Sequence, residues 1–348
     1  MKEKELTEDK QLALLEKIAS RPLADVDLLD DPAPELLQES LQFLQSDKAR
    51  TMLERDPYWP KWDGPWWHMM VLHELGMTKL IPRERIEQLL EAFRRYYLHY
   101  FPFKLEDVPA GTNPLNQIIC HCQMGCIEQL LTAYGINFKE QFPWASDWYE
   151  KHQLPDGGLN CDEAAYTKKN PKSSIVSTLP ALEAVLQSPL LGADAIHKLN
   201  FLERGASYLI ARKLLRSATT GAVINDSWTQ LCFPRFYFYD VLRGGSFLLN
   251  WSLRLERAIP ASAICESMEI IDSQNPSGFI SLGRVSWKDS FTRDWDPATS
   301  NWVRKPESSY PLLDSLSTIG HQSKPLTQEW NRAKTTLRLL LEKKLISP

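Results

Sequence analysis

Hydrophobic residues along this chain recur mainly at the spacing of an α-helix. Residues 84–100 place apolar side chains three and four positions apart, and residues 195–216 repeat that pattern. Alternation with a period of two, the mark of a half-buried strand, is scarce. Residues 236–239 come nearest to it, and Pro234 ahead of them suits the start of a helix. The pattern therefore predicts an all-α protein.

Five more strongly apolar segments recur along the chain, and each carries one carboxylate. The carboxylates are Glu74, Glu128, Glu183, Asp240 and Asp314, with successive gaps of 54, 55, 57 and 74 residues. A helix that is apolar almost all round is buried on both sides, and amphipathic segments lie between these five. Such an alternation predicts an α/α toroid, a helical-hairpin barrel of about five to six repeats. The long last gap leaves room for an insertion at residues 284–305.

The segment from Gln153 to Glu163 predicts a tight turn between two repeats. Its Pro155 and the pair Gly157-Gly158 both oppose a helix interior. At least one residue of this turn needs a positive φ, which glycine adopts without a steric penalty. Residues 144–154 and 173–186, on either side, are predicted helices.

The first 57 residues are less regular than the rest of the chain. They hold two short amphipathic stretches separated by an acidic, proline-flanked segment at residues 25–34. We predict an N-terminal helical extension, residues 1–57, packed on a toroid domain, residues 58–348. We expect residues 330–344 to form a last amphipathic helix that closes the ring.

Composition narrows the class of protein further. Hydrophobic residues make up 43 % and charged residues 24 % of the 348 residues, and the net charge of -4 gives no reason to expect nucleic acid as a partner. No apolar run approaches the roughly 20 residues that span a bilayer, and the charged N-terminus has no signal core. Six cysteines do not make a disulfide framework. We expect a cytoplasmic protein with reduced thiols and no transmembrane segment; the oligomeric state stays open.

The turn carries a family resemblance. Gln153-x-x-Asp156-Gly157-Gly158 resembles the repeat motif of squalene and oxidosqualene cyclases, whose helical toroid is shared by the β-subunits of protein prenyltransferases. The segment from Asn160-Cys161 through Ser173-Ser174 to Leu182-Glu183 is similar to one in bacterial proteins called prenyltransferase-like. The resemblance runs from about residue 60 to the C-terminus. It implies a toroid fold that binds or transforms an apolar molecule, with isoprenoids among the candidates.

The chain also departs from these families. Leu159 stands where the cyclase repeat has its closing tryptophan, and the Asp-x-Asp-Asp acid of class II terpene cyclases is missing from the sequence. Residues 27–31 hold three acids at a different spacing, beside a proline that indicates an exposed turn. Phosphate-binding glycine loops, the Gly-x-Ser-x-Gly elbow and His-Glu-x-x-His are also missing. We therefore do not expect a conventional class II cyclase.

Residues 233–243 hold the most concentrated candidate chemistry, five aromatic residues with two arginines and an acid. Aromatic residues with a few convergent polar groups are typical of a small-molecule pocket. The predicted catalytic residues are Asp240, as acid or anchor, and Tyr239; the predicted ligand-binding residues are Arg235, Arg243, Tyr237, Asn160 and Asp162. In the alternative interpretation the arginines pair with acids of neighbouring repeats, and the repeat carboxylates accept backbone N–H groups from adjacent turns.

Thiols and imidazoles supply a possible metal site. If zinc is bound, the candidate ligands are Cys120, His121, Cys122, Cys161 and His321. Protein prenyltransferases bind zinc through Asp-x-Cys and a later histidine, and lanthionine cyclases use two cysteines and a histidine. Neither spacing is reproduced here. Because buried free cysteines are common core residues, we favour core thiols, with zinc as the alternative.

A second aromatic cluster comprises Trp59, Trp62, Trp66 and Trp67, with His68 and His73 among them. Core packing is its preferred use, because histidines five residues apart do not match a helical zinc pair.

Three functional hypotheses follow. The leading one is a transferase- or cyclase-like enzyme, or a binder, that takes an apolar small molecule into a central aromatic cavity. The second is a non-catalytic toroid scaffold for a peptide or protein partner, and the third is a zinc-dependent transferase or cyclase. An enclosed pocket favours the first, a shallow cavity with a large exposed apolar patch the second, and stoichiometric zinc the third.

Overall fold

The computed structural model describes residues 6–96, 121–145, 147–166, 168–192, 194–288 and 291–348. These residues are predominantly helical, which confirms the all-α prediction. None of the helices they form is both long and apolar enough to cross a bilayer.

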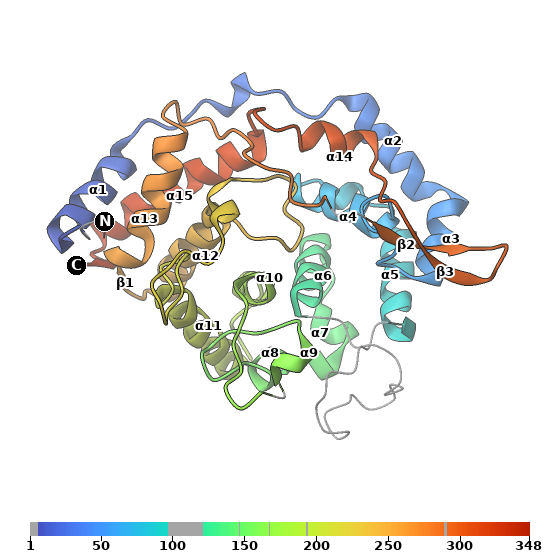
Figure 1. The fold of residues 1–348 in the computed structure, drawn as a ribbon, viewed down its shortest axis with the longest axis horizontal. Helices are drawn as coiled ribbons and strands as arrows, with labels where there is room; N and C mark the ends of the chain where they lie inside the picture. The colour runs from blue at the N-terminus through green and yellow to red at the C-terminus, as the bar shows by residue number, and fades with distance from the viewer. Residues whose placement is uncertain (1–5, 97–120, 146, 167, 193, 289–290) are drawn as a thin grey trace.

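The described helices follow one another along the chain in the order drawn in Figure 1. They are α1 Glu8–Ser20, α2 Pro34–Gln45, α3 Asp47–Arg55, α4 Pro65–Glu74, α5 Arg83–Tyr96, α6 His121–Tyr134, α7 Phe138–Gln141, α8 Trp148–Lys151, α9 Glu163–Tyr166, α10 Ile175–Gln187, α11 Ala195–Ile210, α12 Val241–Leu255, α13 Ala261–Gln274, α14 Pro311–Leu316 and α15 Lys324–Glu342. The strands are β1 Ile259–Pro260, β2 Thr292–Asp296, β3 Asn301–Lys305 and β4 Ile346–Ser347.

Local sequence explains where the long helices begin. Ser174 caps α10 by accepting the backbone N–H of Ser177, and Ser323 caps α15 in the same way. Helix α4 starts with Pro65, whose missing N–H is no loss at the first helical position. These residues satisfy or avoid the free N–H groups that every helix start leaves.

Helices α6, α10 and α12 lie toward the middle of the molecule (Figure 1). Helix α6 approaches α10 most closely at Gly125, where a Cβ atom would lie 2.4 Å from the carbonyl carbon of Pro180. Arg243, in the first turn of α12, bonds Glu183, and Arg254, in its last turn, donates to the carbonyl of Ser188 just after α10. Two arginines of α12 thus contact the second half of α10 and its end.

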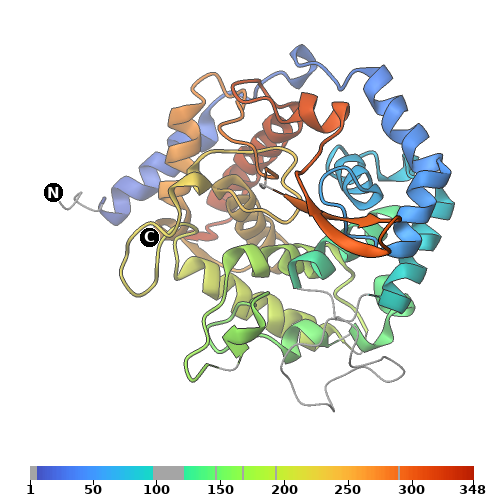
Figure 2. The ribbon, with the colours of Figure 1, turned by 45° about the vertical axis from the view of Figure 1, so that its right-hand side comes forward.

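The N-terminal segment packs against the rest of the chain. Helix α1 contacts α13 and α15, and α2 contacts α3, α4 and α14. Asn331 of α15 joins the two parts directly, since its side chain exchanges two hydrogen bonds with the backbone of Ala24. Figure 2 shows α1, α2 and α3 as an outer strip along one side of the molecule. The predicted boundary between residues 57 and 58 stays a prediction.

The turn after α8 has the predicted backbone. Gly157 adopts a φ of +94°, and its N–H donates to the carbonyl of Leu154. A Cβ atom on Gly157 would lie 2.3 Å from the carbonyl oxygen of Arg204 on α11. Glycine is therefore required twice over, for its φ and for the close approach of α11.

Two local predictions were wrong, and one segment holds a structure that was not predicted. The chain after Pro234 does not enter a helix, because Phe236 takes a φ of +53° and α12 begins only at Val241. Residues 144–154 form a 3₁₀ turn and the one-turn helix α8 instead of a longer helix. The insertion at residues 284–305 holds an antiparallel hairpin, β2 with β3, that the sparse alternation did not reveal. Arg55 of α3 lies 5.1 Å from the Trp295 ring of that hairpin.

Candidate functional site

A cavity of about 800 Å³ lies between α4, α6, α10, α12 and α15. The residues that line it are Leu23, Met70, His73, Glu74, Cys126, Gln129, Glu183, Leu186, Gln187, Arg235, Phe236, Arg243, Ser246, Phe247, Leu249, Asn250, Leu253, Arg254, Glu329, Asn331, Arg332, Ala333, Thr335 and Thr336. Small-molecule sites in proteins are of about this size, roughly 300–1,000 Å³. Of the predicted site residues, Arg235 and Arg243 lie in this lining.

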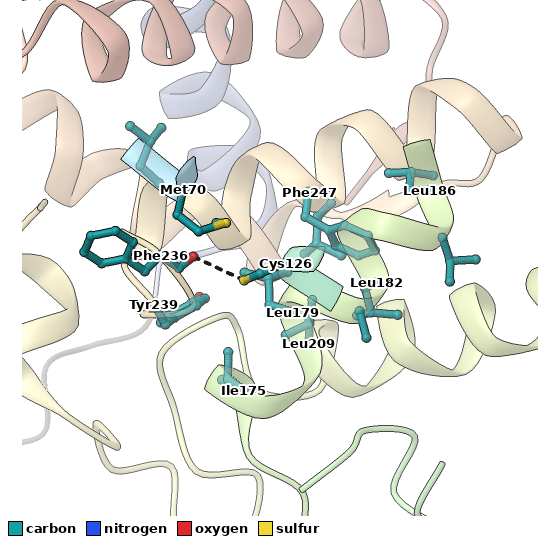
Figure 3. Close-up of a cluster of buried hydrophobic side chains, with 14 of the residues drawn as sticks. Met70, Cys126, Ile175, Leu179, Leu182, Leu186, Leu209, Phe236, Tyr239 and Phe247 are labelled. Carbon is teal, nitrogen blue, oxygen red and sulfur yellow. Dashed lines mark hydrogen bonds between the residues drawn. The ribbon is translucent and has the colours of Figure 1, made fainter. Parts of the chain in front are cut away.

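Apolar side chains form much of the cavity wall. Figure 3 shows Met70, Phe236, Phe247 and Leu186 around Cys126, whose thiol faces the carbonyl of Phe236 at 3.7 Å. Burial raises the pKa of the Cys126 thiol to about 12, so this sulfur behaves as an apolar atom. Phe236 and Phe247 are the aromatic residues of the lining.

The tryptophan cluster lies elsewhere. Trp62, Trp66 and Trp67 are buried in the core and are not part of the cavity lining. The Trp67 ring stands edge-on to that of Phe236, with ring centres 5.1 Å apart. These tryptophans therefore support the wall from behind.

A two-point ion pair joins α10 and α12 in the cavity wall. Arg243 donates from Nε to Oε1 of Glu183 at 2.8 Å and from Nη2 to Oε2 at 2.6 Å. Its Nη1 donates to the carbonyls of Phe236 and Phe238, both at 2.8 Å. Gln129 of α6 adds a hydrogen bond of 3.2 Å to Glu183. Three helices and one turn are thereby held around a single carboxylate.

Glu74, at the end of α4, holds the turn that follows Pro234. Its carboxylate accepts the backbone N–H of Arg235 at 2.7 Å and that of Phe236 at 2.5 Å. Burial raises the pKa of Glu74, and the two N–H groups with the nearby arginines offset part of that rise. The conformation of the turn, with its positive φ at Phe236, is thus matched by a carboxylate from another helix.

Arg235 connects this turn to α12 and α15. Its Nη1 donates to Asp240 at 3.1 Å, and its Nη2 bonds Glu329. Ser246 of α12 donates to the other oxygen of Glu329 at 2.8 Å. Both predicted arginines therefore pair with acids of other elements, as in the alternative interpretation, and they also line the cavity.

Asp240 does not line the cavity. Its side chain is fully buried and caps α12, accepting the N–H of Arg243 at 2.9 Å and that of Cys232 at 3.4 Å. Tyr239 donates its hydroxyl to the carbonyl of Leu214 at 2.7 Å. These are the contacts of the structural alternative, and the acid role of Asp240 stays a prediction.

Tyr237, Asn160 and Asp162 also lie outside the cavity lining. The hydroxyl of Tyr237 is 3.3 Å from that of Tyr58. Asn160 donates from Nδ2 to the carbonyl of Lys172 at 2.7 Å, and its Oδ1 accepts the N–H of the exposed Asp162 at 2.8 Å. The structure thus places this pair in the turn before α9, apart from Arg235 and Arg243.

His73 lines the cavity, although the sequence did not indicate it as a ligand-binding residue. Its Nδ1 is 3.0 Å from the hydroxyl of Thr78, and Nε2 has no hydrogen-bond partner among the described residues. Burial lowers the pKa of His73 to about 4, with Glu183 opposing and Arg243 adding to the effect. The imidazole is therefore neutral near pH 7 and has one ring nitrogen for a ligand.

The thiol cluster forms a second assembly, at the start of α6. Cys122 and Cys161 face each other with sulfurs 3.4 Å apart, and His121 Nδ1 is 3.0 Å from the carbonyl of Asn160. Cys120 lies outside the described residues, and His321 is exposed on the loop before α15. Within the ranges that the structure describes, no three His, Cys, Asp or Glu side chains come together as a metal site.

Comparison with known proteins adds no relative. No protein-family model matches this chain, and no curated protein or solved structure matches it significantly.

Proposed function

We propose that this protein is an α/α toroid of the prenyltransferase and terpene-cyclase type that takes an apolar or amphiphilic small molecule into the cavity between α4, α6, α10, α12 and α15. The observation that carries the proposal is the cavity itself, about 800 Å³, whose lining combines an apolar part around Met70, Phe236 and Phe247 with many polar and charged side chains. An isoprenoid is the first class of ligand to test.

Recurring contacts between successive units support the toroid. Lys79 bonds the carbonyl of Tyr134 across 55 residues, Gln129 bonds Glu183 across 54, and Arg243 bonds Glu183 across 60. Contacts at a similar separation are expected when one structural unit repeats around an axis. This spacing agrees with a ring of five to six helical hairpins.

The charged groups of the lining differ in what they can offer a ligand. Arg235 and Arg243 are each paired with carboxylates, so they position the wall and are not free to grip an anion. Arg254 and Arg332 also line the cavity, and neither has an ion pair among the described residues. An anionic head group, such as a diphosphate, would meet these two arginines.

His73 is the side chain best suited to the polar end of a neutral ligand. Because its pKa lies near 4, it stays uncharged, and its Nε2 can donate or accept one hydrogen bond according to its tautomer. A transferase or cyclase reaction in the cavity is the extension that the family resemblance implies, with Asp240 and Tyr239 holding α12 in place.

Ligand binding tests the proposal directly. Purified protein would be screened against farnesol, geranylgeraniol and farnesyl diphosphate by thermal shift, and positive compounds measured by calorimetry. Leu253 is half-buried and lines the cavity, so Leu253→Trp should fill it and weaken binding at least tenfold. Leu339→Trp is the matched control, because Leu339 is 40 % exposed on α15 and does not line the cavity.

The alternatives give different outcomes. Failure of every lipid to bind, or equal affinity in the Leu253→Trp variant, would contradict the cavity as a ligand site. A preference for farnesyl diphosphate that Arg332→Ala abolishes would assign the head group to Arg332.

A further inference from the structure

The Cys122–Cys161 pair has a geometry that the proposed cavity does not use. The two residues are 39 positions apart in sequence, yet their sulfurs are 3.4 Å from each other. A disulfide bond measures roughly 2.05 Å, so closing it requires a movement of about 1.4 Å. Neither Cys122 nor Cys161 forms a disulfide in the structure.

We propose that Cys122 and Cys161 are a redox-active pair that a low-molecular-weight disulfide, such as oxidised glutathione, converts into an intramolecular disulfide. This modification site is independent of the proposed ligand cavity. It rests on the distance between the sulfurs, on their unequal exposure and on the helix start beside them.

The surroundings give each thiol a different part in the reaction. Cys161 is half-buried, whereas Cys122 is only 7 % exposed, so an external reagent reaches Cys161 first. The backbone N–H of Cys122, in the first turn of α6, donates to the sulfur of Cys161 at 3.4 Å. A first-turn N–H has no partner within its own helix, and it favours the negatively charged sulfur that attacks disulfides.

The backbone on both sides is well held. The N–H of Cys161 donates to the hydroxyl of Ser177 at 3.0 Å, and the preceding carbonyl of Asn160 meets His121. Cys161 is thus anchored to the starts of α10 and α6 at once. Because neither anchor involves the sulfurs, a disulfide can form without breaking these contacts.

The reaction balances in two steps. The Cys161 thiolate attacks one sulfur of oxidised glutathione, forms a mixed disulfide and releases one glutathione thiolate. The Cys122 thiolate then attacks the sulfur of Cys161 and releases the second glutathione thiolate. The two protein thiols lose two electrons and two protons, and oxidised glutathione takes up both as two molecules of reduced glutathione.

The other described cysteines make suitable comparisons. Burial raises the pKa of Cys126 to about 12 and that of Cys265 to about 11, and neither has a second sulfur at a comparable distance among the described residues. An accessible thiol reacts with an external reagent, whereas a buried one is inert. Oxidation is therefore expected to be selective.

The experiment uses the full chain. Reduced, folded protein would be incubated in glutathione redox buffers, alkylated, digested without reduction and analysed by mass spectrometry. We expect two of the six thiols to escape alkylation, and the peptides containing Cys122 and Cys161 to be found joined. The disulfide should also raise the melting temperature, because it closes a long loop in the unfolded chain.

Single variants separate the two steps. Cys122→Ser keeps the attacking thiol and should stop at a mixed disulfide, with one glutathione on Cys161. Cys161→Ser should take up no glutathione and form no disulfide, and Cys265→Ser should behave like the wild type. Circular dichroism would check that each variant is folded.

Three results would overturn the proposal. They are the recovery of all six thiols as alkylated in the folded wild type, a link between Cys122 and Cys126 instead, and a stoichiometric zinc ion that protects Cys122 and Cys161 from the reagent. Each is read from the wild-type protein, so a variant that fails to fold does not weaken the test.

Discussion

Arg243 of α12 binds Glu183 of α10 through two parallel hydrogen bonds, at 2.8 and 2.6 Å, in the wall of the cavity. Both side chains are largely buried, with 9 % and 16 % of their areas exposed. A planar guanidinium facing a carboxylate in this way fixes orientation as well as distance. The pair therefore sets how α10 and α12 lie against each other.

We predict that Arg243→Met will destabilise the fold by about 3–5 kcal/mol, because it leaves Glu183 as a buried charge without its main partner. The carbonyls of Phe236 and Phe238 lose a donor as well. Urea unfolding measures the change. Arg257→Met removes a more exposed ion pair, with Glu203, and should cost less than about 1 kcal/mol.

The double variant Arg243→Met with Glu183→Leu sharpens that test. If the single variant is destabilised by an unpaired charge, removal of both charges should recover much of the loss. A double variant as unstable as the sum of its parts would contradict this explanation.

We predict that Glu128 makes a contribution to stability that is lost as the pH rises from 4.5 to about 7. Burial raises the pKa of Glu128 from 4.5 to about 7, and Lys139 and the Tyr149 hydroxyl offset only part of that rise. The folded state then binds a proton more tightly than the unfolded state, and this contribution is lost as the proton leaves. The loss reaches about 3 kcal/mol above pH 7.

Comparison of the wild type with Glu128→Gln isolates the contribution of Glu128 to the pH dependence of stability. The variant stays neutral at all pH values, so its stability relative to the wild type should rise between pH 5 and pH 8 by the amount that Glu128 loses. Glu16→Gln, at an exposed position of α1, should keep the wild-type pH dependence. Buried His68 and His73, with pKa values lowered to about 3 and about 4, act in the opposite sense in every variant and cancel from the difference.

Gly157→Ala should destabilise the fold by more than about 2 kcal/mol. The new Cβ would meet the carbonyl oxygen of Arg204 at 2.3 Å, in addition to the cost of a φ of +94° for alanine. Gly221→Ala is the control for the backbone strain alone, because Gly221 has a φ of +70° and no atom lies within 4 Å of the added Cβ. It should cost only about 1 kcal/mol, and equal losses in the two variants would show that α11 moves away.

The sequence predicted features that depend on local chemistry and spacing. The apolar segments around Glu74, Glu128 and Glu183 became α4, α6 and α10, since a helix apolar on all sides has to be buried. The positive φ at Gly157 followed from paired glycines after a proline. The all-α class followed from the dominant helical period.

Features that depend on contacts between residues far apart in the sequence could not be predicted. Phe236 adopts a positive φ in a turn that Glu74, 162 residues earlier, holds by accepting its N–H, and no neighbouring residue indicates this. His73 enters the cavity because α4 meets α10 and α12 there. One partial signal existed for the hairpin of residues 292–305, since Asp296-Pro297 marks the turn between its strands.

The five carboxylates of the apolar segments show what the repeat in the sequence did and did not predict. Glu74 and Asp240 accept backbone N–H groups from a turn and a helix start, as the structural alternative predicted. Glu183 instead accepts side chains, and Asp314 is exposed and accepts the hydroxyl of Ser309. Recurrence in sequence therefore predicted neither a common place in the helices nor a common set of partners, since Glu74 ends α4 whereas Asp240 caps α12.

Asp240→Asn decides between the two roles assigned to Asp240. Asparagine still caps a helix, so α12 should keep its start, but Arg235 loses one of its two buried carboxylate partners. We expect a loss of about 2 kcal/mol in stability, and Asp240→Ala should lose about 1 kcal/mol more with the cap. Because Asp240 does not line the cavity, the affinity for a lipid ligand should change less than twofold.

An acid role for Asp240 requires a different result. Turnover of an isoprenoid substrate would then fall at least a hundredfold in Asp240→Asn, while the protein stays folded and binds the substrate as before. Parallel measurement of calorimetric affinity, turnover and urea unfolding on the same three proteins separates these outcomes.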